Sequence, residues 1–418
     1  MNAPSKTDRA STRRRDVSLT TLKRKLIGTP LRTAEAPHQR LSKFAALAVF
    51  SSDALSSVAY ATEEILLVLV LAGSAGLPWS WPVSIGIAVL LLIVTTSYRQ
   101  TIHAYPSGGG AYLVVKENIG ILPALIAAAA LLIDYVLTVA VSVAAGVAAI
   151  TSAFPNLHAH RVGLGILFIG LITLANLRGV KESGRIFAVP TYMFITALAL
   201  MIGIGLAKQY FSGSPAATPQ VAVSAQQLSV FLLLRAFASG CTALTGVEAI
   251  SDGVTAFRYP EDRNASVTLG WMAGILLTLF LGITFLSLQC GVVPRPGETL
   301  VSQLARNVFG TGLFYYLIQA ATAMILILAA NTSYADFPRL ASILARDRFL
   351  PQQFTSRGDR LVFSNGIIGL GLLASALIWL FRCETHALIP LYAVGVFVSF
   401  TLSQAGMVRR SLSLRRSG

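Results

Sequence analysis

Ten apolar runs, most of them about 20 residues long, recur along the chain, and this is the length of helix that crosses the hydrocarbon core of a bilayer. Hydrophobic residues make up 54% of the 418 residues and charged residues only 12%. Because a bilayer offers no water to unpaired backbone groups, such segments form helices. The sequence predicts an all-α polytopic membrane protein with spans at residues 44–73, 83–98, 119–153, 163–177, 187–207, 227–256, 265–290, 312–337, 364–381 and 387–408.

The basic residues gather on alternate loops, as the positive-inside rule requires of cytoplasmic segments. The few of the 33 Lys and Arg residues that depart from this pattern are Arg161, Lys208, Arg295, Arg306 and Arg382 on outer loops and Arg235 within a span. The pattern predicts a multi-pass membrane protein with both termini cytoplasmic. Since the loops account for the net charge of +15, that charge does not indicate a nucleic-acid partner.

Three regions are expected. Residues 1–43 are predicted to be a basic cytoplasmic arm attracted to anionic membrane lipid. Residues 44–408 are the predicted transporter core, in which one repeat covers about 44–207 and the other about 227–408. Residues 409–418 are a short cytoplasmic tail.

Spans one and six are interrupted by small residues at corresponding positions, five spans apart. The interrupting residues are Ser51, Ser52, Ser56 and Ser57 in span one and Gly240 and Gly246 in span six. Broken helices at matching positions of two halves are typical of inverted-repeat transporters, whose site lies near the midplane. Small residues also serve close helix packing, but the nearby carboxylates of Asp53 and Glu248 favour a site, because a charge costs roughly 3 kcal/mol or more at the bilayer centre.

Other polar side chains are expected to face these breaks. On span three, Asp134, Thr138 and Ser142 recur every four residues and share one helix face, with Tyr135 beside them. Thr245 and Glu248 are expected to share a face just past the break in span six. The candidate ion-binding and coupling residues are Asp53, Tyr60, Asp134, Tyr135, Thr138, Ser142, Thr245, Glu248 and Tyr392.

Carboxylate and hydroxyl oxygens suit a hard cation, and no accompanying His or Cys indicates zinc or copper. Three carboxylates would overcharge a site for one monovalent cation, which predicts that at least one is protonated during part of the cycle. The expected ligands are therefore a transported cation and a proton, with no cofactor and no resident metal.

Several residues leave alternatives open. The alternative role for Tyr392 is packing between helices. For Ser142 it is a hydrogen bond to its own helix backbone, and for Glu248 it is that of a gate. Glu63, Glu64 and Asp252 are expected to be vestibule or salt-bridge residues.

Two motifs resemble a known family. The segment from Tyr105 to Tyr112 (YPSGGGAY) resembles the signature of the amino acid-polyamine-organocation (APC) superfamily. The run from Phe50 to Glu64 (FSSDALSSVAYATEE) is similar to the KimA-type high-affinity potassium importers of that superfamily. The resemblance implies a LeuT-like 5+5 inverted repeat with spans one and six unwound, and uptake of potassium with protons at the nine candidate positions.

The resemblance also implies two further spans and a carboxyl-terminal cytoplasmic domain, which the family associates with dimerisation and with control by cyclic di-AMP. The sequence contains neither, so a homodimer is expected to be weakened and the response to the nucleotide to be lost.

Two other functions are considered. An amino acid permease of the same superfamily is expected to hold the substrate carboxylate with glycine-rich amides at the first break, where this chain has serines and an aspartate. A membrane sensor or enzyme has less support, because Ser107-Gly108-Gly109-Gly110 lacks the Lys-Ser/Thr ending of a phosphate loop. The sequence predicts a secondary active transporter for potassium and no enzyme.

Overall fold

The computed structural model describes residues 40–106, 108, 110–178, 184–212, 226–355 and 363–417. The predicted basic arm therefore lies outside the described residues except for residues 40–43. The α-helices are α2 (Lys43–Phe50), α3 (Ser52–Ser56), α4 (Val58–Leu69), α5 (Ser80–Ala104), α6 (Ala111–Asn118), α7 (Ile121–Ala153), α8 (Arg161–Leu177), α9 (Gly184–Ser212), α10 (Val230–Gly240), α11 (Ala249–Asp252), α12 (Glu261–Gln289), α13 (Leu300–Phe309), α14 (Leu313–Arg346), α15 (Ser364–Leu380) and α16 (Thr385–Ser417). Short 3₁₀ segments join several of them, including η5 (Cys241–Leu244).

The described residues contain nine helices that are long and apolar enough to cross a membrane, and the shorter apolar helix Ser364–Leu380 is the tenth span. The predicted all-helical, multi-pass architecture is confirmed. Several helices are longer than their predicted spans: α14 continues to Arg346 and α16 to Ser417. Hydropathy marks only the part inside hydrocarbon, whereas the backbone hydrogen bonds continue into the polar surroundings.

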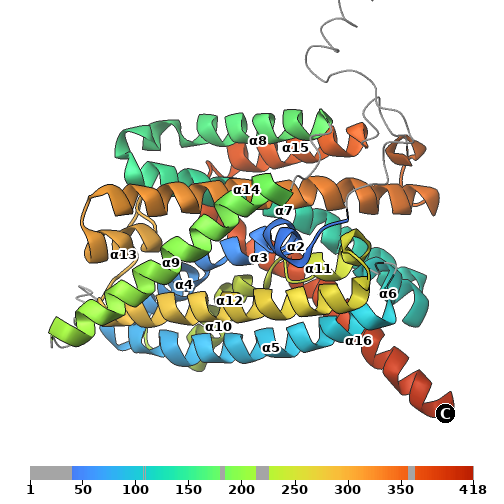
Figure 1. The fold of residues 1–418 in the computed structure, drawn as a ribbon, viewed down its shortest axis with the longest axis horizontal. Helices are drawn as coiled ribbons and strands as arrows, with labels where there is room; N and C mark the ends of the chain where they lie inside the picture. Colours follow the sequence, from blue (N-terminus) through green and yellow to red (C-terminus); the bar gives the residue numbers. More distant parts are fainter. Residues whose placement is uncertain are drawn as a thin grey trace, which may run out of the picture.

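The two halves pack in a symmetric pattern (Figure 1). Helices α4, α5, α7 and α8 each pack chiefly against the helix of the same rank in the second half, which are α10, α12, α14 and α15. The fifth helix, α9, packs on α14, and its counterpart α16 packs on α7. Because five spans separate the counterparts, the two halves cross the membrane in opposite directions. The LeuT-like 5+5 inverted repeat is confirmed, with the broken helices at its centre.

Span one is interrupted at Ser51 and at Ser57, on either side of the five-residue helix α3. The Ser57 hydroxyl donates a hydrogen bond to the Ala54 carbonyl at 2.6 Å, and the Ser56 hydroxyl donates to the Asp53 carbonyl at 2.7 Å. Ser51 and Ser57 keep right-handed helical dihedrals. The predicted break is therefore a double kink and not an unwound segment, because the serine hydroxyls bond the carbonyls of the preceding turn.

Span six is broken more sharply. Helix α10 ends at Gly240, Thr245 is extended (φ −65°, ψ 146°), and Gly246 has φ +76°. Thr245 thus lies within the break, so the predicted helical face shared by Thr245 and Glu248 is wrong. Gly240 does not cause the break: a Cβ there would lie 2.4 Å from Cγ1 of Ile65, so this glycine allows α10 to approach α4.

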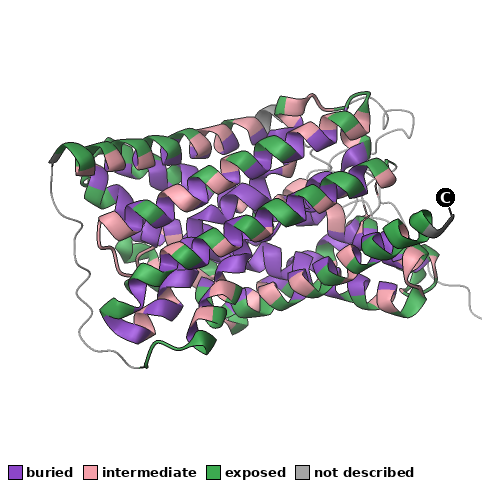
Figure 2. Ribbon diagram, turned by 90° about the horizontal axis from the view of Figure 1, so that it is seen from below, coloured by how far each residue is buried: buried purple, intermediate pink, exposed green. Residues whose placement is uncertain are grey.

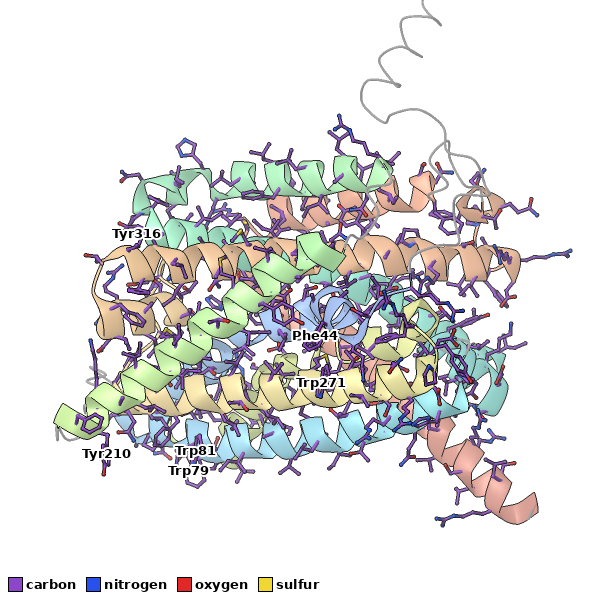
Figure 3. The ribbon with its side chains drawn as sticks, in the orientation of Figure 1. Phe44, Trp79, Trp81, Tyr210, Trp271 and Tyr316 are labelled. Carbon is purple, nitrogen blue, oxygen red and sulfur yellow. The ribbon has the colours of Figure 1, made fainter. Side chains whose placement is uncertain are left out.

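The outward faces of the helices are exposed and the interior is buried and closely packed (Figure 2). Many of the exposed side chains are large and apolar. Trp79, Trp81, Tyr210 and Tyr316 lie toward one end of the long helices, opposite to the end from which α16 projects (Figure 3). Aromatic side chains at such a level mark a membrane–water interface. The long helices therefore have their ends at the two membrane surfaces.

Candidate cation site

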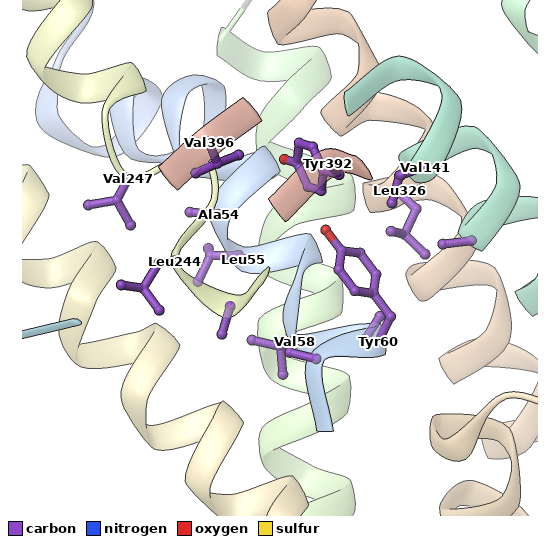
Figure 4. Close-up of a cluster of buried hydrophobic side chains, with 14 of the residues drawn as sticks. Ala54, Leu55, Val58, Tyr60, Val141, Leu244, Val247, Leu326, Tyr392 and Val396 are labelled. Carbon is purple, nitrogen blue, oxygen red and sulfur yellow. The ribbon is translucent and has the colours of Figure 1, made fainter. Parts of the chain in front are cut away.

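The two broken helices meet at Gly246. A Cβ on this residue would lie 2.7 Å from the backbone nitrogen of Ala54 and 2.8 Å from Oδ2 of Asp53. The positive φ and the absent side chain both favour glycine here. The close-up shows Ala54 and Leu55 of span one beside Leu244 and Val247 of span six (Figure 4). The break in span six therefore lies directly against the carboxylate of span one.

Five carboxylates line one small cavity of about 10 Å³, and three of them are predicted site residues from different elements. Asp53 comes from α3, Asp134 from α7, and Glu248 from the residue that precedes α11; their exposed fractions are 6%, 2% and 7%. Oδ1 of Asp53, Oδ1 of Asp134 and Oε2 of Glu248 have no hydrogen-bond partner among the described residues. The described residues that line the cavity include no basic side chain. An unpaired buried carboxylate is costly, so this arrangement suits a cation or a proton.

Hydroxyl groups lie next to these carboxylates. Tyr135 and Thr138 line the cavity, and Oγ1 of Thr138 donates a hydrogen bond to the Tyr392 hydroxyl at 3.3 Å. The hydroxyl of Tyr60 points toward Tyr392 (Figure 4) and has no partner within the described part of the chain. Tyr392 therefore does more than fill space between helices, since its hydroxyl connects α16 to the cavity wall.

Four of the nine predicted site residues do not line the cavity: Tyr60 and Tyr392 lie near it, and Ser142 and Thr245 use their positions differently. Ser142 is buried one turn beyond Thr138 but is not among the residues that line the cavity. Thr245 uses its hydroxyl to donate to the carbonyl of Thr242 at 2.8 Å, within the break itself. The structure brings Asp53, Asp134, Tyr135, Thr138 and Glu248 together directly, with Tyr392 joined through Thr138.

Residues 41–411 match the amino acid permease family. The chain belongs to this family. It is 52% identical over 399 residues to the potassium transporter KimA of Bacillus subtilis (strain 168), an alignment that covers 95% of this chain and 66% of that protein. The predicted similarity to KimA is thus confirmed, and the chain spans just under two thirds of the relative's length.

A solved structure of a manganese transporter from Eremococcus coleocola, in complex with an aromatic bis-isothiourea substituted compound, is also similar. The match has 14% identity and a TM-score of 0.37, and it covers 89% of this chain and 76% of the other.

Helix α14 of this permease contributes site residues that the sequence did not reveal. Thr332, Ser333 and Asp336 complete the cavity lining together with Asp252. Asp336 lies near the predicted end of span eight, where an aspartate is ordinary, and in the structure it pairs with Arg339 at 3.6 Å. The sequence did contain one signal. The polar residues at 332, 333 and 336 interrupt span eight, which is the counterpart in the second half of span three, the span that carries Asp134.

Asp252 also lines a second cavity, of about 110 Å³, whose wall includes Gly108, Gly110 and Arg339. Gly108 has φ +82°, and a Cβ on it would lie 3.0 Å from the carbonyl oxygen of Asp252. The glycine-rich turn therefore lies against the end of α11. Asp252 therefore lies between the central cavity and this second cavity and lines both of them.

Proposed function

We propose that this permease imports potassium together with protons by alternating access. The observation that carries the proposal is the convergence of three buried carboxylates, each with an unpartnered oxygen, on a cavity whose described lining contains no basic side chain. Oxygen atoms of carboxylates and hydroxyls are the ligands that hard cations prefer. A curated relative with 52% identity is named a potassium transporter, and that name supports potassium over other monovalent cations.

An amino acid is a poorer fit to this cavity. Its carboxylate would meet Asp53 at the first break, and the like charges would repel each other at short range and in a medium of low dielectric constant. The family also includes amino acid permeases, as its description says. Inhibition of cation uptake by amino acids is therefore the measurement that distinguishes potassium import from amino acid import.

Proton coupling follows from charge balance. One monovalent cation neutralises one of the three carboxylates, and each of the other two negative charges, if buried without a partner, would cost several kcal/mol. A proton on Asp134 or Glu248 lowers that cost, and proton release on the other side of the membrane would then be tied to cation release. On this basis Asp53, Asp134, Tyr135, Thr138 and Glu248 are the proposed ligands and coupling groups, and Tyr60, Ser142, Thr245 and Tyr392 lie outside the cavity lining.

We also propose the membrane orientation that the charge pattern predicts. Both termini are cytoplasmic, and the end of the bundle that carries α13 faces the outside of a bacterial inner membrane. The cavity of Gly108, Gly110 and Asp252 is then the cytoplasmic vestibule.

Uptake of rubidium-86 by potassium-transport-deficient cells that express the chain tests the function. We expect uptake that excess potassium inhibits and amino acids do not. Asp53→Asn should abolish uptake at an unchanged membrane-inserted level, because it keeps the shape and removes the charge. Asp262→Asn, which alters a partly exposed aspartate hydrogen-bonded to His103, is the matched control and should transport normally. Inhibition by an amino acid, or normal uptake by Asp53→Asn, would overturn the proposal.

A further inference from the structure

A second group of buried charges lies further along span one, on the side of α13. Glu63 and Glu64 are consecutive on α4, and their exposed fractions are 3% and 5%. Nδ1 of His386 lies 2.5 Å from Oε1 of Glu64, and Nε2 lies 3.5 Å from Oε1 of Glu63. The backbone N–H of Leu300 donates to Oε2 of Glu63 at 3.0 Å. The group therefore joins α4, α16 and the start of α13.

This group opens onto a large cavity, which we call the outer vestibule. Its volume is about 440 Å³, and Glu63, Thr385 and His386 form part of its wall. The Thr385 hydroxyl is 6% exposed and has no hydrogen-bond partner among the described residues. A buried hydroxyl oxygen without a partner, in the same cavity wall as Glu63 and His386, is a vacant ligand position for a cation.

The charges of the group do not balance internally. A protonated His386 neutralises one of the two carboxylates and leaves one negative charge in excess. Two other acidic groups of the vestibule wall already have partners: Glu384 pairs with Arg161 at 2.5 Å, and Glu298 pairs with Arg306 at 3.0 Å. His386 is thus the cation that the structure places between Glu63 and Glu64.

The position of the group points to the path of the substrate. Tyr60 and Glu64 are four residues apart on α4 and share a helix face, about 6 Å apart along the axis. The hydroxyl of Thr62 is hydrogen-bonded to that of Thr284 on α12 at 3.0 Å, which holds this part of α4 in place. A cation that enters from the vestibule therefore passes Glu63 and Glu64 before it reaches Tyr60.

We propose that Glu63, Glu64 and Thr385 form an entry station for a monovalent cation, at which the side chain of His386 is a tethered competitor. An arriving cation takes the place of the imidazolium charge between the carboxylates and then moves one turn inward. This inference deepens the proposed function and rests on it for the identity of the cation.

Kinetics of rubidium-86 uptake test the station through KM, since a purely structural cluster would change kcat or protein level and leave KM unmoved. Glu64→Gln should raise the KM for external rubidium about tenfold, as should His386→Lys, which keeps a permanent charge at the station. His386→Gln should lower KM. Glu384→Gln, which removes a vestibule carboxylate outside the station, is the matched control and should keep the KM of the unaltered chain.

Equilibrium binding of rubidium-86 to purified protein gives a second readout that does not require transport. Asp53→Asn protein should still bind rubidium, and the double variant Asp53→Asn/Glu64→Gln should not. Absence of rubidium uptake by the unaltered chain, with binding intact, would refute the transport function and leave the station standing. The same KM in Glu64→Gln as in the unaltered chain, or equal binding by the single and double variants, would overturn the station.

Discussion

At Gly246 the broken span of the second half contacts the broken span of the first half. The φ of this glycine, +76°, is disfavoured for side chains larger than hydrogen, and the space that a Cβ would need is occupied by the Ala54 nitrogen and the Asp53 carboxylate. Backbone in this conformation is stable only where the surrounding structure requires it. The glycine therefore sets both the shape of the break and the position of the carboxylate beside it.

Gly246→Ala is expected to impair uptake strongly and to lower thermal stability, because the added methyl group displaces Asp53 and strains the backbone by about 1 to 3 kcal/mol. The measurements are rubidium uptake and the Tm of the detergent-purified protein. Gly270→Ala on α12 is the control, since a Cβ there meets nothing within 4 Å. Full uptake by Gly246→Ala would show that the break tolerates a side chain.

At the scale of single elements, α6 is held against the end of α14 by one carboxylate. Nζ of Lys116 and the hydroxyl of Tyr112 each donate to Oδ2 of Asp347 at 2.6 Å. These hydrogen bonds, with that of Lys116 the larger cause, hold the pKa of the Asp347 carboxyl below its usual value. The contact connects the segment that follows the glycine-rich turn to the helix that carries Asp336.

A carboxyl with a lowered pKa stabilises the folded state at pH values above its ordinary pKa, and the contribution is lost as pH falls through the lowered value. Asp347→Asn should therefore have a lower Tm than the unaltered protein at neutral pH, and the difference should shrink on acidification. Thermal unfolding followed at a series of pH values measures this. A Tm difference that stays constant down to acid pH would mean that the ion pair with Lys116 is not its source.

At the scale of the whole molecule, the central cavity of about 10 Å³ has room for little more than one water-sized sphere. A cavity of about 440 Å³ lies on the α13 side, and one of about 110 Å³ adjoins the central cavity through Tyr135, Asp252 and Asp336. The structure thus has the form of a closed central site between two vestibules. Transport then requires the bundle to open one vestibule at a time onto Asp53, Asp134 and Glu248.

Symport predicts that uptake increases when the outside is acidified. In proteoliposomes with the membrane potential clamped, one unit of pH gradient should support about tenfold accumulation of rubidium if one proton accompanies each cation. Glu248→Gln should remove or alter this dependence, because one proton-accepting carboxylate is lost from the site. Flux that is indifferent to the pH gradient in the unaltered protein would refute coupling.

The sequence by itself determined the class of fold, the number of spans and the places where two of them break. These features depend on hydropathy and on local backbone chemistry, which act along the chain. Gly246 is one example. The small residues next to it in the sequence and its own lack of a side chain are enough to predict a break in span six. The face shared by Asp134 and Thr138 is another, because helical periodicity alone brings them to one side of α7.

Only the tertiary structure decided which of these residues meet. Asp336 and Asp252 line the cavity and Ser142 does not, because lining depends on how α7, α11 and α14 are rotated and packed against one another. Gly240 ends α10 at the break, as predicted, and it also allows the close contact with Ile65 of α4, which the sequence did not show. His386 joins Glu63 and Glu64 across more than 300 residues of sequence. Such contacts are absent from the local pattern because they arise only when non-adjacent helices pack together.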